Sequence, residues 1–341
     1  MDSTMTRTGP ASALEYIASG GTPFFRLPAP SVHASGEPSY AGMDAVLLGV
    51  PYDGGATIQA GARLAPYHVR RVSAFAQSHH LGHEIDVFAG LHAVDGGNLV
   101  APPFDAALAR ETIRAGIARV VREGAVPLVV GGDHSITLPI LRAIASAYGP
   151  IAVVHVDAHL DTSDGSLWGD DYHHGTPFRH ALTEGLIRPR DLHQIGIRAS
   201  AATAAEARFS RDHGASVHTI DDVCDRGIDA IAAEVRTAVA GGPVYVSFDV
   251  DAIDPAFAPG TGTPVPGGLS AREAIRLLRR LAGIRIVGMD VVEVLPALDH
   301  ADITSHLAAQ LLFEGLALTA LARARPLAGQ EATCAFERRC A

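Results

Sequence analysis

The sequence predicts an α/β protein with a mostly parallel central sheet of about eight strands and helices on both faces of that sheet. Two observations support this fold class. Short Val- and Ile-rich runs alternate with longer stretches of helical period, which is typical of strands alternating with helices. Several of the short runs are apolar on both faces, as strands covered by helices on each side must be. The 341 residues, 48% of them hydrophobic, suffice for one large core.

The predicted strands follow the apolar runs along the chain and lie at 44–50, 91–95, 126–131, 151–157, 192–197, 216–220, 243–249 and 284–290. The predicted helices include the stretches of helical period at 103–123, 136–148, 228–240, 270–282 and 304–323. The helix at 270–282 opens with Ser270 and has Glu273 three residues later, which is the pattern of a capping box.

The chain divides into three segments in our prediction. Residues 1–42 are rich in Gly, Pro and Ser, and we expect a lead-in with little regular structure. Residues 43–325 form a single domain, because about eight strands suit one large domain better than two small ones. Residues 326–341 form a tail that holds Cys334 and Cys340, and whether these two pair is left open. With Cys224 they make three cysteines, too few for a disulfide framework or a four-cysteine zinc site.

Charge and composition exclude several classes of protein. The formal net charge is −10, which disfavours a non-specific nucleic-acid binder. All 27 basic residues are Arg, and a chain without Lys can neither form a Schiff base nor build a Walker A loop. The N-terminus lacks a basic start followed by an apolar core, and no run approaches 18 apolar residues. We therefore expect a cytoplasmic protein with no membrane segment.

Polar clusters follow four of the predicted strands, at 131–135 (GGDHS), 157–161 (DAHLD), 249–255 (DVDAIDP) and 290–293 (DVVE). Ligands bind beyond the carboxyl ends of strands in open α/β sheets, so these clusters should meet at one edge. Within an extended backbone, residues two apart point the same way. Several carboxylates gathered there would repel one another unless cations lay between them. Carboxylate and imidazole ligands without thiolate suit Mn²⁺, Mg²⁺ and some Zn²⁺ or Fe²⁺ sites.

Taken in order, the motifs GGDHS, DAHLD, SFDVDAIDP and GMDVVEV resemble those of the ureohydrolase (arginase/agmatinase) superfamily, over about residues 44–320. VPYDGG at 50–55 and HGTPF at 174–178 also match. EGLIRPRDLHQIGIR at 184–198 and PAFAPGTGTP at 255–264 are more similar to the agmatinase branch, whereas YHHGTPFRH at 172–180 also resembles hydrolases of guanidino acids. The resemblance implies a three-layer α/β/α fold, with residues 43–325 as the catalytic domain, and an oligomer, often a trimer or hexamer.

The resemblance also implies two Mn²⁺ per subunit. One ion would be held by His134, Asp157, Asp161 and Asp249. The other would be held by Asp157, His159, Asp249 and Asp251. Asp157 and Asp249 would then bridge the pair, and Asp254 would shape the turn that follows.

Our hypothesis for the reaction is Mn-dependent hydrolysis of a guanidino compound to urea and an amine. Metal ions acidify a bound water, which makes it a strong enough nucleophile for the delocalised guanidinium carbon. Asp161 would accept a proton from the attacking water and pass it to the leaving nitrogen. Glu293 would hold the guanidinium by paired hydrogen bonds, and His174 would carry a proton to solvent.

The substrate is the open question. The loop between Asp161 and His174 carries three acidic residues and no Arg, which tilts the prediction toward a cationic tail and hence toward agmatine, with putrescine and urea as products. The alternative is a guanidino acid such as 4-guanidinobutyrate, 3-guanidinopropionate or a proclavaminate-like compound, and Arg179 or Arg198 would then reach its carboxylate. A second alternative is a catalytically silent metal-binding member. The chain departs from the family pattern at Gln59, Ala65 and His306.

Overall fold

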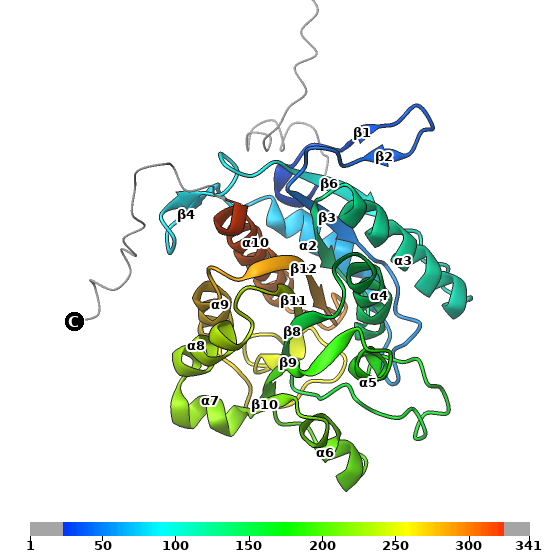
Figure 1. Ribbon diagram of the computed structural model, residues 1–341, viewed down its shortest axis with the longest axis vertical. Coiled ribbons are helices and arrows are strands. Elements are labelled where there is room, and N and C mark those ends of the chain that lie inside the picture. Colours follow the sequence, from blue (N-terminus) through cyan, green and yellow to red (C-terminus); the bar gives the residue numbers. More distant parts are fainter. Residues whose placement is uncertain (1–22, 324–341) are drawn as a thin grey trace, which may run out of the picture.

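The computed structural model describes residues 23–323. Its centre is an eight-stranded sheet in the order β10-β9-β8-β11-β12-β7-β3-β6, and every neighbouring pair is parallel (Figure 1). The strands are β3 (Ala45–Gly49), β6 (Ala93–Asn98), β7 (Val126–Val130), β8 (Ile151–Val156), β9 (Ile187–Ile197), β10 (Ser216–Thr219), β11 (Pro243–Asp249) and β12 (Arg285–Val292).

Helices cover both faces of the sheet, so the three-layer α/β/α prediction is confirmed (Figure 1). On one face pack α2 (Ala65–Ser73), α7 (Ile220–Arg226), α8 (Ile228–Ala238), α9 (Ala271–Arg280) and α10 (Ile303–Arg323). On the other pack α3 (Ala106–Arg122), α4 (Thr137–Tyr148) and α5 (Pro177–Thr183), while α6 (Ala204–Asp212) lies beside the edge strand β10. Two separate apolar cores result, one on each face.

The predicted strands all occur, with β9 beginning at Ile187 rather than at residue 192. The helix α9 begins with the predicted capping box, in which the Ser270 side chain accepts from the Glu273 backbone and the Glu273 carboxylate accepts from the Ser270 backbone. The short helices α2, α5, α6 and α7 were not predicted, because seven to nine residues give too few turns for a clear period.

The described end of the N-terminal lead-in packs into the protein. Phe24 and Phe25 are fully buried in a short 3₁₀ turn, η1 (Phe24–Arg26), against α2, and the Phe24 backbone donates to Asp95 at 2.8 Å. Small hairpins follow, formed by β1 (Ser31–Val32) with β2 (Pro38–Ser39), and by β4 (His79–His80) with β5 (Ile85–Asp86). Cys224 is exposed, and Cys334 and Cys340 lie outside the described residues.

Within residues 23–323, one helix has the length and composition of a membrane span. It is α10, with 21 residues and a mean hydropathy of 1.2 over its most apolar window. However, 72% of that window is buried inside the protein, against the sheet and the helices α2 and α9. We therefore assign α10 to the core, where a helix that is apolar nearly all round belongs.

Gly132 should not tolerate a side chain. A Cβ atom at this position would lie 1.5 Å from the carbonyl oxygen of Tyr52, and the backbone there is fixed because Tyr52 accepts from Asp133 and Val50 accepts from Gly132. We expect Gly132→Ala to cost about 3 kcal/mol of unfolding free energy, measured by chemical denaturation. Gly90→Ala is the matched control, since no atom lies within 4 Å of its added Cβ. Equal stability of the two variants would contradict this packing argument.

Candidate metal centre

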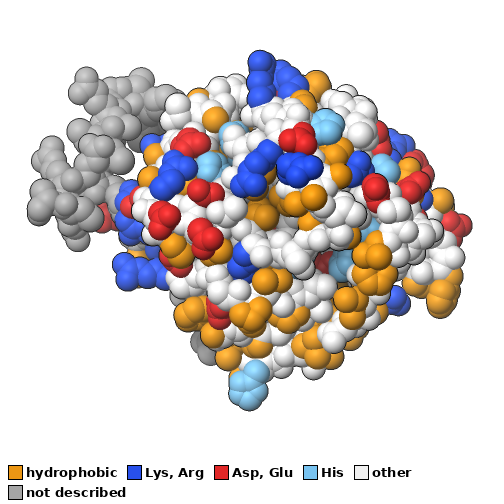
Figure 2. All heavy atoms as spheres, turned by 90° about the horizontal axis from the view of Figure 1, so that it is seen from below, with side chains coloured by type: hydrophobic (Ala, Val, Ile, Leu, Met, Phe, Trp, Pro, Cys, Tyr) orange, Lys and Arg blue, Asp and Glu red, His pale blue; other side chains and the backbone are white. Residues whose placement is uncertain are grey.

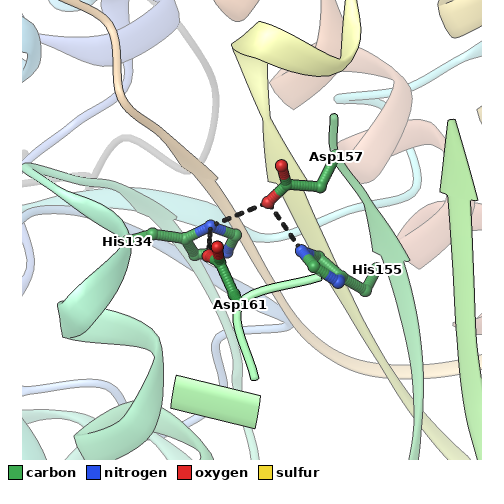
Figure 3. A group of neighbouring side chains, drawn as sticks. All are labelled: His134, His155, Asp157 and Asp161. Carbon is green, nitrogen blue, oxygen red and sulfur yellow. Dashed lines mark hydrogen bonds and ion pairs between the residues drawn. The ribbon is translucent and has the colours of Figure 1, made fainter. Parts of the chain in front are cut away.

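The four polar clusters meet where the sequence predicts. They follow β7, β8, β11 and β12, which are neighbours in the sheet in the order β8-β11-β12-β7. Because these strands are parallel, their carboxyl ends lie at one edge. The cluster residues therefore approach a common point from four separate stretches of the chain, as Figure 3 shows for two of these stretches.

His134 lies at the middle of this centre, in the short 3₁₀ turn η3 (His134–Ile136) that follows β7. Its ring is buried, and its Nδ1 lies 3.1 Å from Asp157 Oδ2 and 2.9 Å from Asp161 Oδ2 (Figure 3). The same nitrogen lies 3.3 Å from Asp249 Oδ2. These are the distances expected of donor atoms that share one cation.

The other ring nitrogen of His134 decides what Nδ1 can do. Its Nε2 is 2.8 Å from Ser247 Oγ, and that hydroxyl donates to Asp290 Oδ1 at 2.7 Å. Because Ser247 donates its only hydroxyl hydrogen to Asp290, its oxygen must accept from His134, and His134 Nε2 therefore carries a proton. Nδ1 is then left with a lone pair that faces three carboxylate oxygens, a contact that only a proton or a metal ion can make favourable.

A second group shares Asp157. His159 Nδ1 lies 2.9 Å from Asp251 Oδ2 and 3.5 Å from Asp157 Oδ1. Asp157 thus offers one carboxylate oxygen to the group around His134 and the other to the group around His159, which is the arrangement of a bridging ligand. Two sets of side chains offer ligand-type atoms that all lie within 4.8 Å of one another, as a metal ion requires: His134, His155, Asp157 and Asp161, and Asp157, His159 and Asp251.

The centre is strongly charged and shielded from water. Asp157, Asp249 and Asp251 are each at most 3% exposed. Burial, together with the neighbouring carboxylates Asp251 and Asp157, raises the pKa of Asp249 well above its ordinary value. Burial alone lowers the pKa of His134, but its hydrogen bonds to the carboxylates raise it well above the ordinary range. The donor set therefore demands positive charge, and oxygen and imidazole donors without sulfur suit a divalent ion such as Mn²⁺.

A third group of ligand-type side chains provides a contrast. His80 Nδ1 accepts from the His83 backbone at 3.0 Å, and His80 Nε2 pairs with Glu314 Oε2 at 2.8 Å. The other oxygen of Glu314 accepts from Arg279 and Gln310. These polar atoms already have partners, one of them a guanidinium cation, so this group is better described as a buried ion pair than as a metal site.

Glu293 and His174 lie beside the centre and contact each other. Glu293 Oε1 accepts from the His134 backbone at 2.9 Å and lies 2.8 Å from His174 Nδ1. His174 Nε2 lies 2.8 Å from the Thr57 hydroxyl. Burial lowers the pKa of His174, but the hydrogen bond and charge of Glu293 raise it to about 9. Glu293 and Asp161 both adopt positive φ, at 63° and 51°, which is uncommon for residues with a side chain and is often found at functional sites.

A cavity of about 330 Å³ opens onto the centre. Asp161, Asp249, Asp251 and Glu293 belong to its lining, as do Trp168 and Glu206. Its lining includes five carboxylates and no Arg among the described residues. Figure 2 shows one face of the molecule, on which Arg and acidic side chains are mixed and a hollow contains histidine and acidic side chains.

The charged residues considered in the argument about the substrate tail do not line the cavity. The loop acids Asp164, Asp170 and Asp171 are not among the residues that line the cavity. Neither are the two Arg residues expected to reach a carboxylate: Arg179 donates to Thr162 O, and Arg198 donates to backbone carbonyls, among them those of Ala252 and Val265.

The structure also shows where Asp254, Asp290 and the departures from the family pattern lie. Asp254 accepts from three backbone N–H groups of the following turns, which fits the turn-shaping role expected of it. Asp290, which belongs to the same polar cluster as Glu293, is fully buried and accepts from Thr137, Tyr245 and Ser247. Of the departures from the family pattern, Gln59 and His306 are exposed and Ala65 is buried at the start of α2, and none lines the cavity.

The comparisons agree with this geometry. Residues 43–317 match the Arginase family. The chain belongs to the arginase family. It is 43% identical to proclavaminate amidinohydrolase of Streptomyces clavuligerus over 84% of this chain and 90% of that one. A solved structure of that enzyme matches with a TM-score of 0.83 and 41% identity, over 89% and 98% of the two chains.

Two further relatives have other names. The chain is 42% identical to guanidinopropionase of Pseudomonas aeruginosa (93% and 97% covered) and 40% identical to mitochondrial agmatinase of Gallus gallus (90% and 88% covered). The chain is thus an amidinohydrolase of guanidino compounds, a hydrolase of C–N bonds in amidines, in a family of binuclear manganese enzymes. The comparisons leave its substrate open.

Proposed function

We propose that this arginase-family protein is a manganese-dependent hydrolase that converts agmatine and water to putrescine and urea. One observation carries the metal part of this proposal: His134 Nδ1, the ring nitrogen that does not bond Ser247, converges with three carboxylate oxygens. Two ions per subunit fit the two groups that share Asp157. Their ligands would be His134, Asp157, His159, Asp161, Asp249 and Asp251.

When bound, the metal ions supply an acidified water as the nucleophile. The chain supplies orientation and proton transfer. Glu293 is held at its Oε1 by the His134 backbone and by His174, so its charge is fixed at the edge of the cavity where it can pair with a guanidinium. Asp161 accepts a proton from the attacking water and passes it to the leaving nitrogen. His174, which bonds Thr57 in the cavity lining, exchanges a proton with solvent.

The cavity wall supports a cationic substrate tail. Glu206 is the acidic residue in the described lining besides Asp161, Asp249, Asp251 and Glu293. Trp168, which is 47% exposed, belongs to the same lining. A carboxylate attracts an ammonium group, and the face of an indole ring does so as well. A carboxylate tail would meet Glu206 without an Arg in the lining to offset the repulsion. This favours agmatine, whose tail ends in an amine.

A guanidino acid is the second candidate, because two of the similar chains are named for such substrates: proclavaminate amidinohydrolase and guanidinopropionase. In that case a backbone N–H or a hydroxyl group at the cavity mouth would have to bind the carboxylate, since Arg179 and Arg198 are bonded elsewhere. A catalytically silent metal-binding protein is the third possibility, which the charged pair of Glu293 and His174 argues against.

A urea-release assay separates these three. We expect Mn²⁺-loaded protein to release urea from agmatine with the highest kcat/KM in a panel that also holds arginine, 4-guanidinobutyrate, 3-guanidinopropionate and a proclavaminate-like acid. A higher value for one of the guanidino acids would overturn the agmatine assignment and leave the hydrolase assignment intact. Release of urea from none of them would support the silent protein.

The proposal has three further parts, of which the catalytic domain and the oligomer rest on the family resemblance and the cytoplasmic location rests on the sequence pattern. Residues 43–325 are the catalytic domain, consistent with the matched range 43–317. The enzyme works in the cytoplasm, and its subunits form a trimer or hexamer, which the molar mass in solution would test.

A further inference from the structure

We propose that His155 is a positioning residue that fixes the bridging carboxylate of Asp157, and that Gln194 holds His155 in the one tautomer that can do so. This inference deepens the proposed function and rests on its metal centre. Neither residue belongs to the motifs that predict the six candidate ligands. In Figure 3 the rings of His134 and His155 lie on either side of Asp157, and a dashed line joins each ring to the carboxylate.

The register of the sheet creates the arrangement. His155 on β8 lies directly opposite Gln194 on β9. Both side chains are fully buried, and the His155 ring packs against Phe178 with a centroid distance of 3.9 Å. His155 and Asp157 are two residues apart along the chain, so both side chains leave the backbone in the same direction.

A chain of hydrogen bonds determines where the proton of His155 lies. The backbone carbonyl of Leu160 can only accept, and it is 2.7 Å from Gln194 Nε2, so this end of the amide is the donor. The same nitrogen lies 3.0 Å from His155 Nδ1, which must therefore accept. A neutral imidazole that accepts at Nδ1 carries its hydrogen on Nε2, and Nε2 lies 2.7 Å from Asp157 Oδ2.

These bonds decide between two roles for His155. Both of its ring nitrogens are already used, one by Gln194 and one by Asp157, so no lone pair faces the centre and His155 is not a ligand. Instead it donates to the carboxylate oxygen that lies 3.1 Å from His134 Nδ1. The other oxygen of Asp157 accepts from the His159 backbone at 2.6 Å. Each oxygen thus has one fixed donor, which leaves the carboxylate a single orientation from which to serve both groups.

Two variants of His155 test the proposal. His155→Met keeps the length of the side chain and removes the donor, whereas His155→Gln keeps an N–H donor near the position of Nε2. We expect His155→Met to weaken Mn²⁺ binding by about 10- to 100-fold, measured by calorimetry on metal-free protein, and His155→Gln to stay close to the wild type. Partners of metal ligands typically have effects of this size.

Gln194→Met and His193→Met complete the series. Gln194→Met removes the group that fixes the tautomer of His155 and leaves Asp157 unchanged. We therefore expect a loss of Mn²⁺ affinity that is smaller than for His155→Met. The melting temperature of the metal-free protein checks that the variant folds. His193→Met is the matched control, because His193 is a buried imidazole on the same strand and no bond joins it to the centre.

The outcomes separate this inference from the proposed function. Failure of wild-type protein to bind Mn²⁺ would overturn the proposed function. If the wild type binds Mn²⁺ and His155→Met binds equally tightly, the positioning role of His155 is wrong and the metal centre stands. If His155→Gln loses as much affinity as His155→Met, the imidazole itself is required, and His155 is a ligand rather than a positioning residue.

Discussion

Asp249→Asn is expected to lower kcat by roughly 10³-fold while raising the melting temperature of the metal-free protein. The loss of activity follows from removing a charged ligand, because metal assistance is worth several kcal/mol of barrier and about 4 kcal/mol corresponds to 10³ in rate. The gain in stability follows from charge. Asp249 is buried beside Asp157 and Asp251, and its raised pKa means that folding disfavours its ionised form at neutral pH.

The amide keeps the local structure of this site. Asp249 Oδ1 accepts from the Asp251 backbone at 2.8 Å, which an amide oxygen can also do. Relief of repulsion worth about 1 kcal/mol would raise the melting temperature by on the order of 2 °C.

Calorimetric melting with and without Mn²⁺ tests both halves of this prediction. The wild type should gain stability from Mn²⁺, because a ligand that binds only the folded state stabilises it. The Asp249→Asn variant should gain little stability from Mn²⁺. A variant that melts lower than the wild type without metal would show that Asp249 is not under repulsion in the folded chain. A variant with wild-type turnover would remove Asp249 from the ligand set.

The fold could be predicted because its signals are local. Each strand of the sheet is a short apolar run bounded by polar residues, and the order of strands and helices allows few other arrangements. Burial confirms this reading: in β7 and β8 every residue is buried, as expected for strands covered on both sides. The lead-in was harder to predict, because Phe24 and Phe25 are buried by contacts with α2, far away in the sequence.

In the site, too, some residues could be predicted from the sequence and others could not. Its six candidate ligands lie in compact motifs at strand ends, so sequence could place them together. His155 and Gln194 could not be found that way, because their meeting depends on the register between β8 and β9. The signal that was available for His155 is its spacing of two residues from Asp157 on one strand. The position of Arg198 could not be predicted either. Its guanidinium donates to backbone carbonyls of the loop at 251–266, and no local sequence pattern indicates these contacts.

Glu293→Gln is expected to lower kcat/KM for every guanidino substrate by about 10²-fold while Mn²⁺ binding is retained. Glu293 is not among the six candidate ligands, and its role is to pair with the guanidinium through charge. A hydrogen bond to a charged group is worth about 1.5–3 kcal/mol, which corresponds to this loss in rate. Glutamine preserves the shape and can still accept from the His134 backbone at Oε1. The expected change is therefore electrostatic.

Two readouts distinguish this role from a structural one. Glu293 raises the pKa of His174, so removing its charge lowers that pKa, and His174 then loses its proton at a lower pH than in the wild type. An alkaline limb of the rate profile that is due to His174 should move to lower pH in Glu293→Gln. Glu206→Gln is the matched control. It should lower kcat/KM for agmatine and leave kcat/KM unchanged for substrates without a cationic tail. Equal kinetics of Glu293→Gln and the wild type would show that the guanidinium is held by another group.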